Sequence, residues 1–245
     1  LSEPEAGSDV ASMKARAIPT QNGWKLNGEK SWISNGGIAD FYTLFARTGD
    51  QSGTSGISAF LLQADNPGLS IAERQEVMAP HPLARLELND VFLHQNTLLG
   101  EEGKGFATAM ATLDIFRPTV GAAALGFARR ALDEALRYSG TRKMYGQSMQ
   151  KMPVIRTRLG EMDLKVDSSA LLVYRAAWAH DQGTGRATRE SSMAKLYATE
   201  SAQQVIDAAV QLFGARGLEK GNAVESLYRE IRALRIYEGA SEVQK

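Results

Sequence analysis

A glutamate beside a glycine stands near the end of the sequence, and its position could make it a base. Tyr237-Glu238-Gly239 directly follows a helix-like run from Ala223 to Arg235. A carboxylate that is fixed at a helix end and shielded from water has a raised pKa, and it can then take a proton from carbon. The alternative is a solvated turn residue, which is the commonest role of a Glu beside a Gly. Other segments are needed to choose between the two.

The elements that must position this carboxylate begin with a strand-rich half, residues 1–98. Short apolar runs of strand length and one alternating run predict strands. These runs cover 41–46, 56–62 and 84–89. Asn22-Gly23 and Asn27-Gly28 are hairpin signals. We therefore expect a β domain over residues 1–98.

Residues 99–245 have helical periodicity instead. One apolar face with Ser169 filling a gap predicts a long helix. Its other members are Ile155, Leu159, Met162, Val166, Val173 and Ala176. Gly183-Thr184-Gly185 should end this helix, and a further one should run over about 188–213. Pro118 and Pro153 suit the first turns of helices. Strands followed by helices, without alternation, predict an α+β fold rather than a doubly wound sheet.

Composition narrows the functional class. The 245 residues carry 28 basic and 28 acidic side chains, so no global charge favours nucleic acid or an anionic membrane. The sequence has no cysteine, which excludes disulfides and thiolate chemistry. His81, His94 and His180 lack metal-ligand spacing. No stretch is long and apolar enough to be a membrane span.

Three sequence blocks occur in a fixed order along the chain. They are Ser2-Glu3-Pro4-Glu5-Ala6-Gly7-Ser8-Asp9, Lys30-Ser31-Trp32-Ile33-Ser34-Asn35-Gly36-Gly37 and Ile236-Tyr237-Glu238-Gly239-Ala240-Ser241-Glu242-Val243-Gln244. Together they resemble the acyl-CoA dehydrogenase family of flavoproteins, and the resemblance runs from Leu1 to Lys245. It implies a small β-barrel middle domain followed by an up-down four-helix bundle.

The resemblance also implies a reaction. The family uses FAD to convert an acyl-CoA thioester to the trans-2,3-enoyl-CoA, as in fatty acid β-oxidation: a base removes the α proton and a hydride leaves Cβ for the flavin. Electrons pass to an electron-transfer flavoprotein, and the expected assembly is a homotetramer or homodimer. Glu238 aligns with the base of the medium- and short-chain branch. A second branch has its base at the position of Phe116, which cannot take a proton, so the resemblance implies Glu238.

The resemblance implies cofactor contacts at individual positions of this sequence. The matching positions are Leu1, Ser2, Gly7, Ser8, Trp32, Ile33, Ser34, Arg142, Tyr145, Gln211, Gly214, Ala215, Ala240 and Glu242. Arg142 and Tyr145 belong to a block that reaches the FAD of a neighbouring subunit, and Arg suits a pyrophosphate because its planar fork binds phosphate oxygens in pairs. Without the resemblance, Trp32 beside a hairpin would indicate core packing.

Substrate contacts carry over in the same way, with one alternative left open. The matching positions are Ser8, Asp114, Phe116, Arg117 and Gly239. Asp114 and Arg117 could instead be an i,i+3 pair on the helix surface, worth a few tenths of a kcal/mol, roughly. Phe116 could narrow the pocket beside the base or belong to the core.

Several positions depart from the family pattern. Ala240 replaces a Thr, Pro153 stands where many members have a Gln that contacts FAD, and Ala215 replaces a Gly. Each change removes a polar or close-approach contact at its own position. None affects Glu238 or the segment around Trp32.

Other functions remain open. An acyl-CoA oxidase would pass electrons to oxygen, and a non-catalytic subunit would only bind flavin or CoA. The chain starts within the first block, and the family has a helical domain before it, so we expect a fragment. Its location, cytoplasmic in a bacterium or the mitochondrial matrix in a eukaryote, cannot be read from the sequence.

Overall fold

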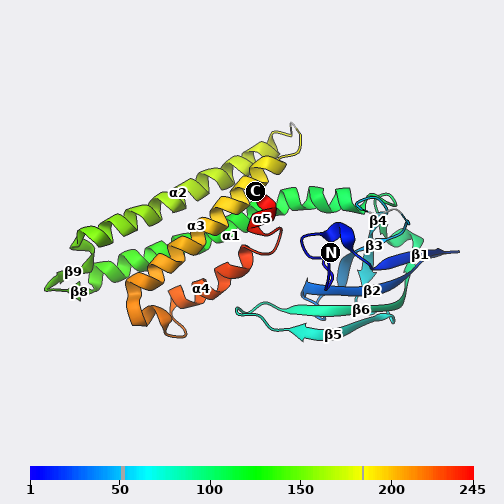
Figure 1. Ribbon diagram of the computed structural model, residues 1–245, viewed down its shortest axis with the longest axis horizontal. Helices are drawn as coiled ribbons and strands as arrows, with labels where there is room; N and C mark the ends of the chain where they lie inside the picture. The colour runs from blue at the N-terminus through cyan, green and yellow to red at the C-terminus, as the bar shows by residue number, and fades with distance from the viewer. Residues whose placement is uncertain (51–52, 184) are drawn as a thin grey trace. The chain divides into compact units, whose positions relative to one another are not determined.

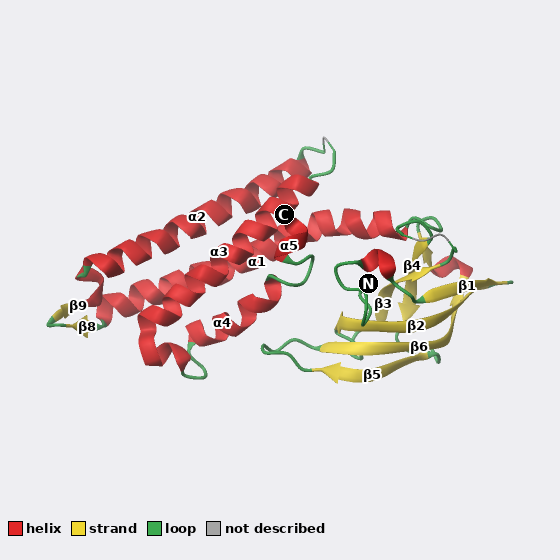
Figure 2. Cartoon of the chain, in the orientation of Figure 1, coloured by secondary structure: helices red, strands yellow, loops and turns green. Residues whose placement is uncertain are grey.

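The computed structural model describes residues 1–50, 53–183 and 185–245. The chain divides into two compact units, Leu1–Ala111 and Thr112–Lys245. The first is built on strands and the second on helices, as the sequence predicts (Figures 1 and 2). Thr184, in the predicted helix end at 183–185, lies outside the described residues.

Among its described residues, the first unit has a seven-stranded sheet in the order β5-β6-β2-β1-β3-β4-β7. The strands are β1 (Arg16–Thr20), β2 (Gly23–Ser34), β3 (Phe41–Arg47), β4 (Ile57–Gln63), β5 (Leu69–Gln75), β6 (Leu83–His94) and β7 (Leu98–Leu99). Short 3-10 helices cover Val10–Ser12 and Gln95–Thr97. β1 and β3 pair in parallel, and the other neighbours pair antiparallel. β5 and β7 do not pair with each other among these residues, so closure into a barrel stays a prediction.

Alternating apolar residues build the core of this sheet. In β6, Leu86 and Leu88 are buried, and the alternation predicted for 84–89 is confirmed. They pack in one cluster with Leu26 and Phe60, and the ring of Phe60 meets the edge of Trp24 at a centroid distance of 5.1 Å. Burying such side chains contributes about 1.5–3 kcal/mol each.

The two Asn-Gly pairs have different roles. Gly23 pairs with Thr20 and closes the hairpin between β1 and β2, so the first pair does mark a turn. The hairpin prediction at Asn27-Gly28 is wrong, because both residues lie within β2 at a shift in its register with β6. Gly28 has φ +147°, and a Cβ there would lie 2.7 Å from Ala15 Cα. A close main-chain approach therefore requires this glycine.

Helices form the second unit. They are α1 (Gly105–Thr141), which begins inside the first unit, α2 (Pro153–Asp181), α3 (Thr188–Phe213), α4 (Ala223–Leu234) and α5 (Ser241–Gln244). A small hairpin, β8 (Lys143–Met144) and β9 (Gln147–Ser148), follows α1, and 3-10 helices cover Met149–Lys151 and Gly214–Leu218. The predicted bounds of α3 are confirmed, and so is Pro153 as the first residue of α2.

Small residues let these helices approach one another closely. The predicted face of α2 is buried, including Ser169, except that Ile155 is half-buried at its start. From α3 come buried alanines such as Ala194 and Ala198. On α1, a Cβ at Gly121 would lie 3.2 Å from both Ala194 O and Val173 Cγ2. A side chain at this point would therefore require the neighbouring atoms to move by a few tenths of an ångström.

The prediction that Pro118 belongs to a first turn is wrong. It lies well inside the 37-residue helix α1. Proline has no N–H to donate to the carbonyl four residues earlier, here that of Asp114. That carbonyl instead accepts a hydrogen bond from Ser191 Oγ on α3, at 2.6 Å. A tertiary contact thus satisfies the acceptor, and the helix continues.

Two features are absent from the described residues. None of their helices has a stretch long and apolar enough to cross a membrane. They also contain no group of three or more His, Cys, Asp or Glu side chains placed to hold a metal ion.

Candidate active site

The turn that carries Glu238 directly follows α4. Asn222 caps the start of that helix by accepting a hydrogen bond from Val224 N–H at 3.1 Å. After the helix, Glu238 and Gly239 adopt left-handed conformations, with φ of +57° and +93°. Such a conformation is uncommon for a residue with a side chain, and the surrounding structure must hold it in place.

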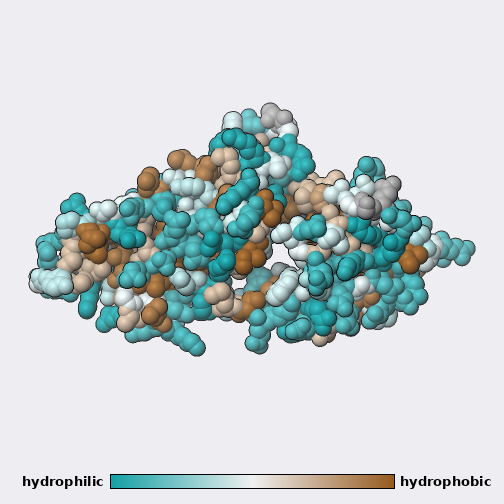
Figure 3. Space-filling view, in the orientation of Figure 1, coloured by the Kyte–Doolittle hydropathy of each residue, from teal (hydrophilic) through white to brown (hydrophobic). Residues whose placement is uncertain are grey.

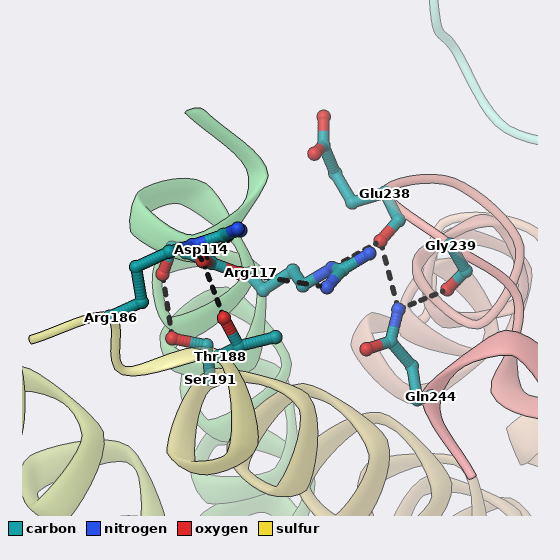
Figure 4. A network of polar contacts seen from close by, with 8 residues as sticks. All are labelled: Asp114, Arg117, Arg186, Thr188, Ser191, Glu238, Gly239 and Gln244. Atoms are coloured by element: carbon teal, nitrogen blue, oxygen red, sulfur yellow. Dashed lines mark hydrogen bonds and ion pairs between the residues drawn. The ribbon is translucent and has the colours of Figure 1, made fainter. Parts of the chain in front are cut away.

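Three buried side chains, those of Arg117, Lys195 and Gln244, hold the main chain of this turn. Figure 4 draws Arg117 and Gln244 beside it. The carbonyl of Glu238 accepts hydrogen bonds from Arg117 Nε at 3.2 Å and Gln244 Nε2 at 3.1 Å. The carbonyl of Gly239 accepts from Lys195 Nζ at 2.7 Å and again from Gln244 Nε2 at 3.1 Å. The donors come from α1, α3 and α5, so the turn is fixed to three helices at once.

Glycine is required at position 239 for two reasons. Its φ of +93° lies in the region that L side chains rarely adopt. A Cβ there would also overlap Gln244 Nε2, one of the atoms that holds the turn. The predicted contact of Gly239 with substrate stays a prediction.

The carboxylate of Glu238 extends away from the groups that hold its main chain (Figure 4). Among the described residues it has no hydrogen-bond partner, and the side chain is half-buried. Burial raises the pKa of Glu238 above its usual range, while the positive charges of Arg117 and Lys195 act in the opposite direction. A half-buried carboxylate with a raised pKa and no partner has the properties of a general base.

A second set of contacts fixes the start of α5. Glu200 on α3 accepts hydrogen bonds from Arg235 Nε at 2.9 Å and from Ser241 Oγ. Ala240 is half-buried and Glu242 is exposed. The predicted cofactor contacts of Ala240 and Glu242 stay predictions.

Asp114 and Arg117 do not form a surface pair; that alternative is wrong because both are buried. Asp114 Oδ2 accepts hydrogen bonds from Arg186 at 2.8 and 2.6 Å and from Thr188 Oγ1 at 2.7 Å (Figure 4). Arg117 lies 3.9 Å from Asp114 Oδ1 and reaches the Glu238 turn. Asp114 thus connects α1 to the start of α3, beside the turn.

Phe116 belongs to the same part of α1 but points elsewhere. Its side chain is 52% exposed, so the alternative that it belongs to the core is wrong. Whether it contacts a substrate stays a prediction, as do the substrate roles of Asp114 and Arg117.

In the first unit, a buried ion pair joins the two predicted flavin segments. Glu3 and Lys30 are both buried, and Lys30 Nζ lies 2.8 Å from Glu3 Oε1. Glu3 also accepts hydrogen bonds from the main-chain N–H groups of Lys14 and Ala15, at 2.5 and 3.0 Å. Although burial alone would raise the pKa of Glu3, Lys30 and these N–H groups hold it below its usual value. Burial lowers the pKa of Lys30 below its usual value, while the charge of Glu3 acts in the opposite direction.

This ion pair sets the N-terminal segment beside the end of β2. Lys30 Nζ donates to the carbonyl of Leu1 at 3.3 Å, and Ser31 N–H donates to the carbonyl of Ser2 at 3.0 Å. The structure thus brings Leu1 and Ser2 next to Trp32, as the flavin prediction requires. Gly7 and Ser8 are exposed, and a Cβ at Gly7 would meet no atom within 4 Å.

Trp32 has an unusual conformation and environment. Its φ is +62°, rare for a bulky residue, and its side chain is 56% exposed. Gln75 holds this conformation, since its Oε1 accepts from Trp32 N–H at 2.9 Å and its Nε2 donates to Ser31 Oγ at 3.1 Å. An exposed indole that is held in place beside the main chain of Leu1 and Ser2 suits contact with a flat aromatic cofactor.

The neighbours of Trp32 have different surroundings. Ser34 Oγ lies 3.1 Å from His81 Nε2 at the exposed end of β2, so a hydroxyl is available there. Ile33 packs against the sheet core instead. The cofactor contacts of both residues stay predictions.

The remaining predicted cofactor residues gather at the other end of the bundle from Glu238. Arg142 and Tyr145 are exposed around the β8–β9 hairpin, and Tyr145 has φ +48° (Figure 1). Gln211, Gly214 and Ala215 are exposed at the end of α3. Stacked rings join these two segments, with Tyr138 and Phe213 centroids 4.2 Å apart. Within one subunit, these residues and Glu238 therefore lie at opposite ends of the helical unit.

Sequence reasoning missed several residues that hold the site. Lys195, Gln244 and Glu200 contact the Glu238 turn, and Gln75 contacts Trp32. One signal was available for Lys195, because it occupies a helix face otherwise made of small residues. Gln244 falls within the third block and could have been singled out there.

Replacing Lys30 with Met should destabilise the first unit strongly. It leaves the Glu3 carboxylate buried without its partner, which costs about 3–5 kcal/mol. Urea unfolding followed by circular dichroism measures the change. Adding Glu3→Gln to Lys30→Met should recover part of the loss, because the buried charge is then absent.

Lys25→Met is the matched control. Lys25 is on the same strand, and its Nζ lies 2.8 Å from Asp90 Oδ2 in an exposed pair. Such pairs contribute about 0–1 kcal/mol. An effect of Lys30→Met no larger than that of Lys25→Met would contradict the proposed importance of the buried pair.

Two family models together match most of the chain. The model for the acyl-CoA dehydrogenase middle domain matches residues 1–91, and that for the acyl-CoA dehydrogenase C-terminal domain matches residues 103–245. These two ranges correspond to the strand-rich and helical parts of the structure.

Individual relatives agree with these matches. A probable acyl-CoA dehydrogenase of Mycobacterium leprae is 40% identical over the whole chain, which spans 64% of that protein. A 3-(aryl)acrylate reductase of Clostridium sporogenes is 39% identical, again over the whole chain and 65% of the relative. The structure of butyryl-CoA dehydrogenase from Megasphaera elsdenii matches with a TM-score of 0.96 at 37% identity, over the whole chain and 64% of that structure. The chain belongs to the acyl-CoA dehydrogenase family, whose members are FAD-dependent oxidoreductases.

Proposed function

We propose that the protein containing this chain is an FAD-dependent acyl-CoA dehydrogenase and that Glu238 is its catalytic base. One observation supports the assignment: buried donors hold the main chain of Glu238, while among the described residues its carboxylate has no hydrogen-bond partner. The cationic side chains therefore bind main-chain carbonyls of the turn, and the carboxylate of Glu238 can still accept a proton. The relatives, which span reductases and dehydrogenases, support the same chemistry.

The proposed reaction gives each part of the chain a role. Glu238 takes the α proton of the acyl-CoA thioester, and the double bond forms between Cα and Cβ. Bound FAD would accept the hydride that leaves Cβ. The main chain near Leu1, Ser2 and Trp32 would hold the flavin ring, because these segments lie together in the first unit. Half-burial of Glu238 keeps its pKa raised, which makes the carboxylate a stronger base.

The residues at the far end of the bundle suit a second cofactor contact. Arg142 is exposed there, and its guanidinium fork can bind phosphate oxygens. We propose that this group, which includes Gln211 and Gly214, contacts the FAD of another subunit, since one copy of the helical unit separates it from Glu238.

Two acceptors could take the electrons from the reduced flavin. We favour an electron-transfer flavoprotein, because one similar solved structure, 36% identical, is named for the electron transferring flavoprotein of Acidaminococcus fermentans, and one relative is a subunit of a caffeyl-CoA reductase-Etf complex. Oxygen is the second candidate, because a matching structure, 31% identical, is that of a prolyl acyl carrier protein oxidase. Hydrogen peroxide formation at the rate of substrate consumption would favour the oxidase.

We also propose that the protein forms homo-oligomers. Large apolar side chains lie exposed along α2, where Figure 3 shows brown residues at the edge of the molecule. They are Leu164, Leu171, Tyr174 and Trp178. Their spacing of seven, three and four residues places them on one helix face. A contiguous exposed apolar face marks an interaction surface.

Leu171→Glu should shift the protein to a smaller species. A charge in the middle of the apolar face cannot be buried in an interface without a large desolvation cost. Light scattering coupled to gel filtration measures the mass. Lys165→Glu, a charge reversal at a lysine on the same helix, is the control and should leave the mass unchanged. An unchanged mass for Leu171→Glu would place the interface elsewhere.

Glu238→Gln should abolish flavin reduction by substrate. The amide cannot take the α proton, and loss of a general base reduces rates by about 10²–10⁴-fold. The measurement is anaerobic bleaching of the flavin in the intact, flavin-loaded protein, with a panel of straight, branched and aromatic acyl-CoAs. The panel also identifies the acyl group.

Glu230→Gln is the control for this experiment. Glu230 is another half-buried glutamate, on α4 before the turn, and its replacement should leave bleaching intact. Bleaching of Glu238→Gln at the wild-type rate would contradict the assignment of the base. If the wild type binds FAD but no acyl-CoA bleaches it, a non-catalytic binding subunit replaces the enzyme.

A further inference from the structure

Lys195 is a buried lysine that the proposed reaction leaves without a role. It lies in the middle of α3, and its side chain is 0% exposed. Its Nζ donates to the carbonyl of Gly239 at 2.7 Å. Lysine is almost never fully buried unless it is paired, because removing an ammonium group from water is costly.

The charged groups around Lys195 come from every element packed against it. Arg117 on α1 and Arg235 after α4 are positive, while Glu238 in the turn and Glu200 on α3 are negative. Glu200 is already paired with Arg235, at 2.8 Å, and Lys245 also acts on it. Among the described residues, no carboxylate lies within ion-pair distance of Lys195. Its strongest contact is therefore a main-chain carbonyl next to Glu238.

A purely structural role would not require this charge. An apolar side chain of similar length would fill the same volume without the desolvation cost, and buried ionic groups are often replaced in this way without loss of stability. What an apolar residue cannot supply is a donor to the Gly239 carbonyl and a positive charge beside Glu238. The donor and the charge both act on the Glu238 turn and do not contribute to packing of the core.

We propose that Lys195 is a positioning residue for Glu238: it fixes the carbonyl of the next residue, Gly239, and supplies a positive charge that keeps the base ionised. The inference rests on the proposed role of Glu238. Lys195 itself touches neither substrate nor cofactor in this account.

The charge of Lys195 lowers the pKa of Glu238. Burial raises the pKa of Glu238, and the charges of Arg117 and Lys195 lower it again. Removing the charge of Lys195 therefore raises the pKa of Glu238 further, and the base becomes protonated at a higher pH. Burial lowers the pKa of Lys195 itself to about 8, so its charge is present below that pH.

Three substitutions separate the hydrogen bond from the charge. Lys195→Met removes both, Lys195→Gln keeps a donor without the charge, and Lys195→Arg keeps both. Thr199→Val is the control, because among the described residues its buried hydroxyl donates to two carbonyls of its own helix. A general disturbance of α3 would affect all four variants.

The first readout is amide hydrogen exchange in the turn and α5. It follows the N–H groups of Ser241, Val243 and Gln244, which bond to carbonyls of Arg235 and Ala240. Lys195→Met should accelerate their exchange on the order of tenfold, because the turn loses an anchor. Lys195→Gln, Lys195→Arg and Thr199→Val should retain protection. This readout needs neither substrate nor turnover.

The second readout is the pH profile of flavin reduction in the intact, flavin-loaded protein. In Lys195→Met and Lys195→Gln the acid limb should move upward by roughly one pH unit, since a nearby charge shifts a carboxyl pKa by about that much. Lys195→Arg and Thr199→Val should keep the wild-type profile. At high pH, Lys195→Gln should approach the wild-type rate, because its base is then fully ionised.

Failure of this inference is distinct from failure of the proposed function. If Lys195→Met keeps both the protection and the acid limb of the wild type, Lys195 is not a positioning residue, while Glu238 remains the base. If the wild type shows no flavin reduction, the proposed function fails, and hydrogen exchange still decides whether Lys195 anchors the turn. Should Lys195→Met not fold, the comparison of Lys195→Gln with Lys195→Arg tests the charge by itself.

Discussion

Hydrogen bonds from buried cationic side chains to main-chain carbonyls are the constraint on which the Glu238 site depends. Two successive residues in left-handed conformations cannot form a regular helical ladder, so their carbonyls need donors from elsewhere. Arg117 and Lys195 provide them, together with Gln244. These groups bind the main chain, and the Glu238 carboxylate has no hydrogen-bond partner within the part of the chain that the structure describes. Local strain and buried charge thus belong to one arrangement, while burial of the carboxyl raises its pKa.

The first unit uses buried charge for a similar purpose. Its Glu3–Lys30 pair connects the N-terminal segment to the end of β2, where Trp32 also has a left-handed conformation. An apolar contact could contribute as much stability, but it would specify the register of these segments less closely, since hydrogen bonds are directional. In both units, then, the segment with a candidate functional residue is strained and is held by a buried lysine.

The sequence predicted what depends on local pattern. Helix bounds and the buried face of α2 follow from periodicity, and the family and the candidate base follow from short blocks around Glu238 and Trp32. Tertiary contacts account for what was missed. Pro118 continues a helix because Ser191, far along the chain, replaces the missing donor. Asp114 is buried beside the start of α3, and Arg117 is buried beside the Glu238 turn. Spacing along α1 contains no sign of either contact.

The central claim is that the Glu238 carboxylate is directed at the reacting carbon. A crystal structure of the intact protein with FAD and a non-reactive acyl-CoA analogue tests it most directly. The account predicts a Glu238 oxygen about 3 Å from the analogue's Cα, with the flavin on the opposite face and the Lys195–Gly239 hydrogen bond intact. A different basic group at Cα, with Glu238 turned away from the ligand, would contradict it.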